Sequence, residues 1–144
     1  DHFKAVNDTF GHLYGDEVLI LIANQLQASF RSRDRVFRFG GEEFVALLPG
    51  VTSETAVEIA ERVRDAFACA ALEVDGLSVA ATVSIGTAVA TQSGFDLDAL
   101  YATADAALYR AKRNGRNRIE AGRPAQDAAP QRNDERMTPA TAGT

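Results

Sequence analysis

The sequence contains few of the features that mark secreted, membrane-spanning or polyanion-binding proteins. Its 144 residues include one cysteine, Cys69, which excludes an intramolecular disulfide and favours a reducing compartment such as the cytoplasm. No apolar run approaches the roughly 20 residues that cross a bilayer, and no signal peptide is visible. The formal charge of −5 provides no broad surface for nucleic acid. Together with the length, these absences indicate one globular domain.

Proline is also scarce, and its distribution divides the chain. Three of the four prolines fall within residues 122–144, where Met137 is the one large apolar residue. Such a segment cannot bury enough surface to offset the entropy that it would lose on ordering. We therefore expect a folded domain over residues 1–121 and a disordered tail over residues 122–144.

Periodic apolar residues predict three helices. The first begins near Gly15 and continues to about residue 30, the second covers about 53–70, and the third runs from about 97 to 113. Each has apolar residues three and four positions apart, which is typical of a helix with one buried face. The Asn114-Gly115 pair is a stop signal for the third helix.

Strands are expected between these helices. Residues 36–39 and 44–48 flank Gly40-Gly41, a two-glycine hairpin signal. Residues 77–85 alternate with a period of two, which predicts one nine-residue strand, and a short strand is expected at 118–120. The order of helix, hairpin, helix, strand, helix and strand predicts an α/β (α+β) domain whose antiparallel or mixed sheet packs against helices.

The hairpin turn is the first candidate site. Glu42 and Glu43 directly follow Gly40-Gly41, at the start of an otherwise apolar strand. A turn followed by a strand that happens to begin with acids is the simpler interpretation. Adjacent carboxylates, however, resist each other's ionisation unless a cation or donor lies nearby. Beside an open backbone they suit a Mg²⁺–phosphate site, because hard cations take oxygen ligands.

Two further clusters have polar side chains at suggestive spacings. The first surrounds Gly11 and Gly15 and contains Asn7, Asp8, His12 and Asp16. It can be a capped loop, or a guanine pocket, since a carboxylate accepts from N1–H and the exocyclic amine. The second, Lys112 and Arg116, can either complement a helix dipole or converge on a polyphosphate.

Taken together, these motifs resemble the GGDEF family of diguanylate cyclases. The Gly-Gly-Glu-Glu-Phe sequence at 40–44 is an accepted form of the family signature, and the pattern D-x-FK-x-x-ND-x-x-GH-x-x-GD matches residues 1–16. T-V-S-I-G stands at 82–86, and A-D-x-A-L-Y-x-A-K-x-x-G-R-N at 104–117. The resemblance extends from Asp1 to about Glu120.

The resemblance implies a palm-like fold similar to class III nucleotide cyclases, with a mostly antiparallel five-stranded central sheet wrapped by helices. The family's first strand and its leading helix would precede Asp1, as would one metal-binding aspartate. We therefore expect an N-terminally truncated fragment that is inactive alone, and an upstream regulatory domain in the full protein. The domain is expected in the cytoplasm, and membrane tethering of the parent protein is left open.

The resemblance also implies an activity, in which two GTP molecules form cyclic di-GMP and release two pyrophosphates. Such enzymes use Mg²⁺ (or Mn²⁺) and act as a homodimer, each domain holding one GTP. The positions that match the family's motifs are assigned the following roles. Asn7 and Asp16 would bind guanine with support from His12. Lys112 and Arg116 would hold the phosphates, helped by the start of a helix at Phe3 and Lys4, which belong to the same substrate-binding set. Glu42 would ligate the metal and activate the 3′-hydroxyl, and Glu43 would assist at the metal.

A product-inhibition site is implied as well. The family's R-x-x-D stands five residues before the glycine pair, and here that position holds Arg31 and Asp34, with Arg62 matching a further arginine. A solvated helix end would contain the same residue types. Relatives can carry another arginine where this chain has Glu58, which would weaken the site.

Two other functional classes are compatible with the same fold. One is a catalytically inactive GGDEF module that binds GTP or cyclic di-GMP as a sensor. The other is a scaffold or dimerisation domain, which would not need the guanine and phosphate residues together. Inactive relatives usually lose the acids of the signature, so the retained Glu42 and Glu43 favour the enzyme.

Overall fold

The computed structural model describes residues 1–90 and 96–123. Helices and strands follow one another as α1 (Phe3–Phe10), α2 (His12–Ser29), β1 (Arg35–Gly40), β2 (Glu43–Leu47), α3 (Ser53–Cys69), β3 (Ala71–Val74), β4 (Leu77–Ala80), β5 (Ile85–Thr87), α4 (Leu97–Arg113) and β6 (Ile119–Ala121). The tail expected after residue 121 lies almost wholly outside the described residues. Among those residues, no helix combines the length and the hydropathy of a membrane span.

The strands associate in pairs. β1 with β2 and β3 with β4 are antiparallel, whereas β5 and β6 are parallel. Over the described residues the chain is therefore a mixed α/β domain with three two-stranded sheets, and not the single five-stranded sheet that the resemblance implies. The parallel pair follows from the connection, because α4 carries the chain back along the sheet before β6 begins.

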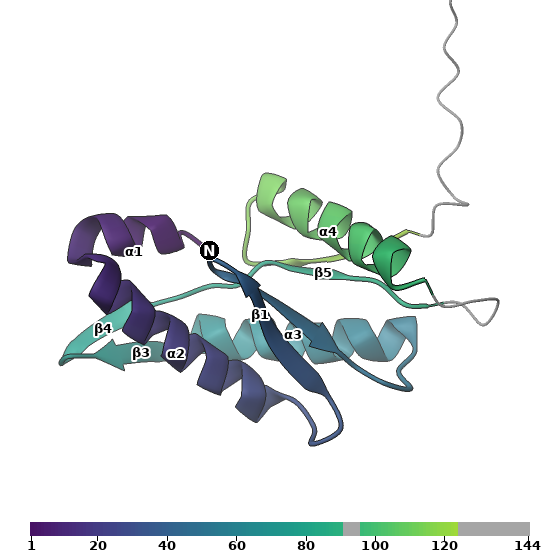
Figure 1. Cartoon of the computed structure of the whole chain (residues 1–144), viewed down its shortest axis with the longest axis horizontal. Coiled ribbons are helices and arrows are strands. Elements are labelled where there is room, and N and C mark those ends of the chain that lie inside the picture. The colour runs from purple at the N-terminus through teal and green to yellow at the C-terminus, as the bar shows by residue number, and fades with distance from the viewer. Residues whose placement is uncertain (91–95, 124–144) are drawn as a thin grey trace, which may run out of the picture.

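Two groups of apolar side chains hold the elements together. β5 and β6 contact both α3 and α4, and in Figure 1 these helices lie on either side of β5. Phe67 of α3 and Ala107 of α4 are both fully buried. A second cluster joins α1 and α2 to the β3–β4 hairpin through the buried Val18, Leu72 and Val74.

The structure corrects the predicted strand over 77–85. The chain forms β4, leaves regular structure at 81–84, and then forms β5. β4 pairs instead with β3, which the sequence analysis missed, across Asp75 and Gly76, both of which have positive φ (49° and 76°). Asp-Gly at positive φ is a preferred two-residue hairpin turn. Residues 82 and 84, in the irregular segment, form hydrogen bonds with Asp1.

The first helix begins earlier than predicted. α2 starts at His12, so Gly15 is inside the helix and not at its start. A short additional helix, α1, precedes it over residues interpreted as a loop, and Gly11 with φ 87° separates the two. Phe3 and Val6 of α1 pack against the second apolar cluster. That packing outweighs the low helix propensity of the polar residues in α1. The hairpin of β1 and β2, α3 and α4 are confirmed.

Candidate functional site

Asp1 is the point at which three segments meet. Its carboxylate accepts hydrogen bonds from Thr82 Oγ1 (2.9 Å), Ser84 Oγ (2.7 Å) and the Asn117 backbone N–H (3.2 Å). Its amino group donates to the Thr82 carbonyl at 2.8 Å. Residue 1, the strand approach at 82–84 and the loop that follows α4 are therefore tied together.

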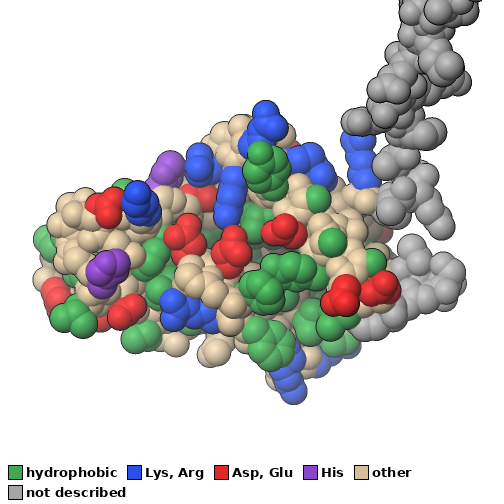
Figure 2. Space-filling model, turned by 45° about the horizontal axis from the view of Figure 1, so that its top comes forward, with side chains coloured by type: hydrophobic (Ala, Val, Ile, Leu, Met, Phe, Trp, Pro, Cys, Tyr) green, Lys and Arg blue, Asp and Glu red, His purple; other side chains and the backbone are tan. Residues whose placement is uncertain are grey.

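The charged residues of the predicted site surround this point. Burial lowers the pKa of the Asp1 amino group; Glu42 raises it, while Lys112 and Arg116 lower it further. The three side chains are thus within electrostatic range of Asp1, although they come from the β1–β2 turn, α4 and the loop after α4. On the face seen in Figure 2, acidic side chains gather beside basic ones.

The β1–β2 turn is open on its outer side. No atom lies within 4 Å of the place that a Cβ would occupy at Gly40 or Gly41. Arg38 Nε donates to the Gly41 carbonyl at 2.9 Å, which fixes the turn from inside. Glu42 is exposed at the turn, and Glu43 pairs with Lys112 at 3.3 Å. The turn thus presents an uncovered backbone at the two glycines and the exposed Glu42 carboxylate to any ligand.

Metal binding at this turn rests on two carboxylates. Among residues 1–90 and 96–123, no three His, Cys, Asp or Glu side chains gather in a group that could hold a metal ion. Glu42 and Glu43 offer the oxygen donors that Mg²⁺ prefers, so the donor chemistry fits. Remaining ligands would have to come from backbone carbonyls, water or substrate phosphates, which is usual for Mg²⁺.

The expected guanine residues lie where α1 and α2 approach each other. Asn7 Oδ1 is buried, and within the described part of the chain it has no hydrogen-bond partner. A Cβ at Gly15 would collide with this oxygen and would press on the Phe3 ring. Gly15 is therefore required for the close contact. Asn7 Oδ1 is thus an exception to the rule that buried polar atoms are hydrogen-bonded, and a ligand or a water molecule could satisfy it.

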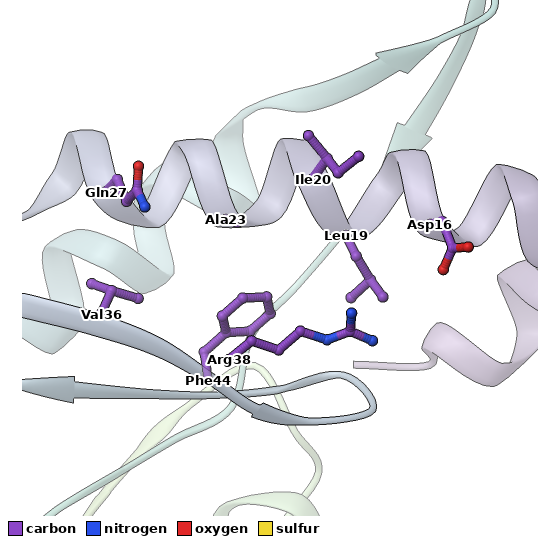
Figure 3. Close-up of a pocket in the computed structure, with 8 residues that line it drawn as sticks. All are labelled: Asp16, Leu19, Ile20, Ala23, Gln27, Val36, Arg38 and Phe44. Carbon is purple, nitrogen blue, oxygen red and sulfur yellow. The ribbon is translucent and has the colours of Figure 1, made fainter.

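A groove of about 460 Å³ runs between α2 and the β1–β2 hairpin. Asp16 lies at one end, and Figure 3 shows the Arg38 side chain extending toward that end past Leu19. Phe44 forms part of its wall. His12 and Lys4 are both exposed, and the described residues give neither side chain a hydrogen bond.

The three residues expected to bind product also come together, at the other end of α2. Asp34 is 9% exposed, and its Oδ2 accepts from the Arg31 backbone N–H at 2.9 Å. The Asp34 N–H donates to the Arg31 carbonyl at 3.0 Å, which closes the turn. Arg62 of α3 donates to the Ser29 carbonyl at 3.1 Å, at the last residue of α2.

Comparison with known proteins decides the family. A family profile described as "Diguanylate cyclase, GGDEF domain" matches residues 1–118. The chain belongs to the GGDEF family. It is 46% identical over 120 residues to the diguanylate cyclase DgcP of Pseudomonas aeruginosa, covering 83% of this chain but 18% of DgcP. The relatives that it matches are thus much longer than this chain.

Solved GGDEF structures agree with this assignment. The crystallised GGDEF domain of YfiN (TpbB) from P. aeruginosa superimposes with a TM-score of 0.79 at 35% identity, covering 85% of this chain and 77% of that one. The GGDEF domain of DgcB from Caulobacter crescentus, solved in complex with c-di-GMP, gives a TM-score of 0.75 at 33% identity, with 84% and 72% covered.

Several residues that shape this GGDEF site escaped the sequence analysis. Thr82 and Ser84 were interpreted as strand residues, although their hydroxyls hold Asp1. Arg64 of α3 donates to Asn117 at 3.3 Å, 53 positions along the chain. Thr82 and Ser84 had a local signal in the T-V-S-I-G motif, which was not interpreted as a contact to Asp1. An arginine on a polar helix face is an ordinary surface residue, so no local signal separates Arg64 from its neighbours.

Proposed function

We propose that this GGDEF domain is a diguanylate cyclase, which condenses two GTP molecules into cyclic di-GMP and releases two pyrophosphates. The observation that carries the proposal is the 3.3 Å pair between Lys112 of α4 and Glu43 of the β1–β2 turn, beside exposed backbone at Gly40 and Gly41 and next to the Asp1–Asn117 contact that holds the loop of Arg116. Two such half-sites must face each other, so the complete protein would act as a homodimer under an upstream regulatory domain.

Guanine would be read between α1 and α2. The base offers two adjacent donor groups, N1–H and the exocyclic amine, and adenine lacks this pair. Asp16 is exposed and can accept from both, and Asn7 Oδ1 is a buried acceptor that needs a donor. His12, at the first residue of α2, would support this loop. The pocket thereby favours GTP over ATP.

The phosphates would lie near the loop that follows α4. Lys112 and Arg116 provide two positive charges there, and the first backbone N–H groups of α1, at Phe3 and Lys4, add donors at a helix start. Lys112 pairs with Glu43 at 3.3 Å in this structure. Nucleotide binding would therefore exchange one partner of Lys112 for a phosphate, which frees Glu43.

The chemistry is a transfer at the α-phosphate, and Glu42 would accept the proton of the attacking 3′-hydroxyl. The 3′-oxygen of one GTP forms a bond to the α-phosphate of the other while the bond to pyrophosphate breaks. Mg²⁺ (or Mn²⁺) bound by Glu42 and Glu43 would supply charge neutralisation at the phosphates. Most of the rate enhancement then comes from positioning and electrostatics.

Product would act back on the enzyme through Arg31, Asp34 and Arg62. Cyclic di-GMP presents guanine edges and two phosphates, which suit an arginine fork and a carboxylate. Binding at this end of α2 need not block GTP, and would instead hold two domains in an arrangement where the half-sites cannot meet.

The proposal is tested by Glu42→Gln in the complete protein. The change keeps the shape of the side chain and removes a metal charge and a base, so synthesis should fall on the order of 10³-fold or more while GTP still binds. Glu54→Gln, an exposed carboxylate in the first turn of α3, is the matched control. Turnover within about tenfold of the wild type would rule out this role for Glu42. Wild-type protein that binds GTP without making product would instead support the sensor alternative.

A further inference from the structure

The loop after α4 has an unusual backbone. Gly115, Arg116 and Asn117 have φ values of 116°, 61° and 46°, so three successive residues adopt positive φ. Residues other than glycine rarely enter this region, because the Cβ approaches the following carbonyl. Such a conformation persists only where the surroundings fix it. The contacts of this loop therefore decide where the Arg116 side chain lies.

Two contacts from distant parts of the chain fix Asn117. Its backbone N–H donates to Asp1 Oδ2 at 3.2 Å, and its side-chain Oδ1 accepts from Arg64 Nη1 at 3.3 Å. Arg64 is itself oriented on α3 by Glu61, at 2.9 Å, and by the neighbouring Asp65. The Arg116 backbone makes two further hydrogen bonds: its N–H donates to the Ala111 carbonyl at 3.0 Å, and its carbonyl accepts from Arg118 Nε at 3.3 Å.

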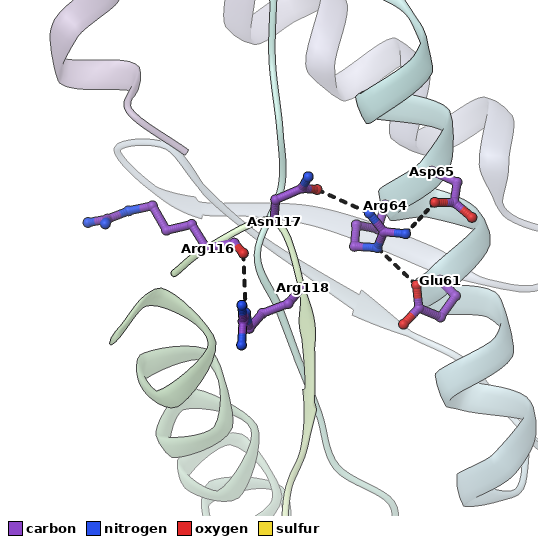
Figure 4. A network of polar contacts seen from close by, with 6 residues as sticks. All are labelled: Glu61, Arg64, Asp65, Arg116, Asn117 and Arg118. Atoms are coloured by element: carbon purple, nitrogen blue, oxygen red, sulfur yellow. Dashed lines mark hydrogen bonds and ion pairs between the residues drawn. The ribbon is translucent and has the colours of Figure 1, made fainter. Parts of the chain in front are cut away.

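The two side chains of the loop extend in opposite directions. Figure 4 shows Asn117 directed at Arg64, and the Arg116 guanidinium on the other side of the backbone. Because the two residues are adjacent, an anchor on Asn117 restricts the peptide that joins them and hence the direction of Arg116. Arg64 remains a cation throughout, since its hydrogen bond with Glu61 raises its pKa above the already high ordinary value.

The geometry points to Arg64 as a positioning residue for nucleotide binding: by bonding Asn117 it holds the left-handed loop in the form that presents Arg116 to the polyphosphate of GTP. The inference rests on the proposed function. Arg64 touches no substrate in this account and acts through Asn117 alone. The competing account is a purely structural link between α3 and the loop, which would affect stability and leave nucleotide affinity unchanged.

The test measures the Kd of a non-hydrolysable GTP analogue by calorimetry, and KM and kcat for GTP, in the complete protein. Arg64→Gln removes one partly exposed hydrogen bond, so Kd and KM should rise roughly threefold to tenfold while kcat stays within about twofold. Arg64→Lys retains the charge and should recover part of the loss. Arg110→Gln removes another arginine contact to a distant carbonyl, that of Ala121 at the end of β6, and is the matched control that should leave Kd unchanged.

Asn117→Gly provides an independent check. Glycine accepts the left-handed backbone, so this variant keeps the loop conformation and loses only the bond to Arg64. Its loss of affinity should match that of Arg64→Gln, and the double variant should be no worse than either single one. Additive losses would overturn the proposed link.

A structural readout separates this inference from the proposed function. Amide hydrogen exchange over residues 115–118 should accelerate in Arg64→Gln with or without nucleotide, while α3 retains its protection. Unchanged exchange, or lower thermal stability with unchanged nucleotide affinity, would reject the positioning role. Wild-type protein that binds no GTP analogue would reject the proposed function and this inference with it, whatever the exchange shows.

Discussion

Polar side chains lie near both ends of α2, but they lack a hydrogen-bond partner at one end and have partners at the other. At its N-terminal end, Asn7 Oδ1 is buried against Gly15 without a partner. At its C-terminal end, Asp34 is bonded to Arg31 and Arg62 is bonded to the last turn of the helix. The helix has 18 residues, so the two ends lie about 27 Å apart. One rigid element thus separates a group that awaits a ligand from groups that already have partners.

This difference predicts two kinds of binding behaviour. A buried acceptor without a donor is costly, and a ligand that satisfies it recovers that cost on binding. At the other end, a ligand of Arg62 must first displace the Ser29 carbonyl, so part of its interaction energy is spent on that exchange. We therefore expect substrate binding at the N-terminal end to open the contact over Asn7 and satisfy this acceptor, and the C-terminal end to respond only when product accumulates.

The largest effect is expected from Gly15→Ala at the N-terminal end. A methyl group there would collide with Asn7 Oδ1 and approach the Phe3 ring, so the buried Asn7 amide must leave its place, a cost typical of overpacking. GTP affinity should fall about a hundredfold, and the inhibition constant for cyclic di-GMP should stay within about twofold. Asn24→Ala, at an exposed position on the same helix, is the control. Unchanged GTP affinity, measured by calorimetry, would show that the contact between α1 and α2 does not shape the substrate pocket.

A smaller effect is expected from Arg31→Ala at the C-terminal end. The substitution removes the side chain but keeps the backbone N–H that bonds Asp34, so the turn should remain. The inhibition constant for cyclic di-GMP should rise roughly thirtyfold, as for the loss of charge-assisted hydrogen bonds, while the uninhibited rate stays constant. Arg33→Ala, in the same turn, is the control. Identical inhibition curves for Arg31→Ala and the wild type would mean that this arginine is only part of a charged helix end.

The smallest effect is expected from Asn7→Ala, which should weaken GTP binding without lowering the stability of the fold. Loss of the amide should weaken GTP binding about tenfold. The same change removes a buried acceptor that has no donor in the described structure, so the free energy of unfolding should stay constant or rise slightly. Chemical denaturation and nucleotide titration of the same preparation measure both. A loss of stability with unchanged affinity would make Asn7 a structural residue.

Local patterns predicted much of this architecture. α3 and α4 follow from regular apolar spacing, and the β1–β2 hairpin follows from its two glycines. α1 could not be predicted in the same way, because Asn7 and Asp8 are typical loop residues and only packing of Phe3 and Val6 makes the segment helical. The parallel pairing of β5 with β6 joins strands that lie on either side of α4 in the sequence. Strands of three residues are too short for their sequence pattern to predict such a pairing.

The candidate site also has a part that the sequence predicted and a part that it did not. Residue types and spacing singled out Glu42, Lys112 and Arg116, and the structure brings all three around Asp1. Their functional roles remain predictions. The anchoring of the loop by Arg64 was not foreseen, since it joins residues 53 positions apart and depends on a strained backbone that sequence spacing does not reveal.

The central claim is tested most directly by the products that the complete protein forms from GTP and Mg²⁺. Chromatography and a pyrophosphate assay should find one cyclic di-GMP and two pyrophosphates for every two GTP consumed, and no dinucleotide from ATP. Because two domains must meet, the specific activity should rise with protein concentration when the protein is dilute. A preparation that binds GTP at one site per domain and yields no cyclic di-GMP at any concentration would contradict the account.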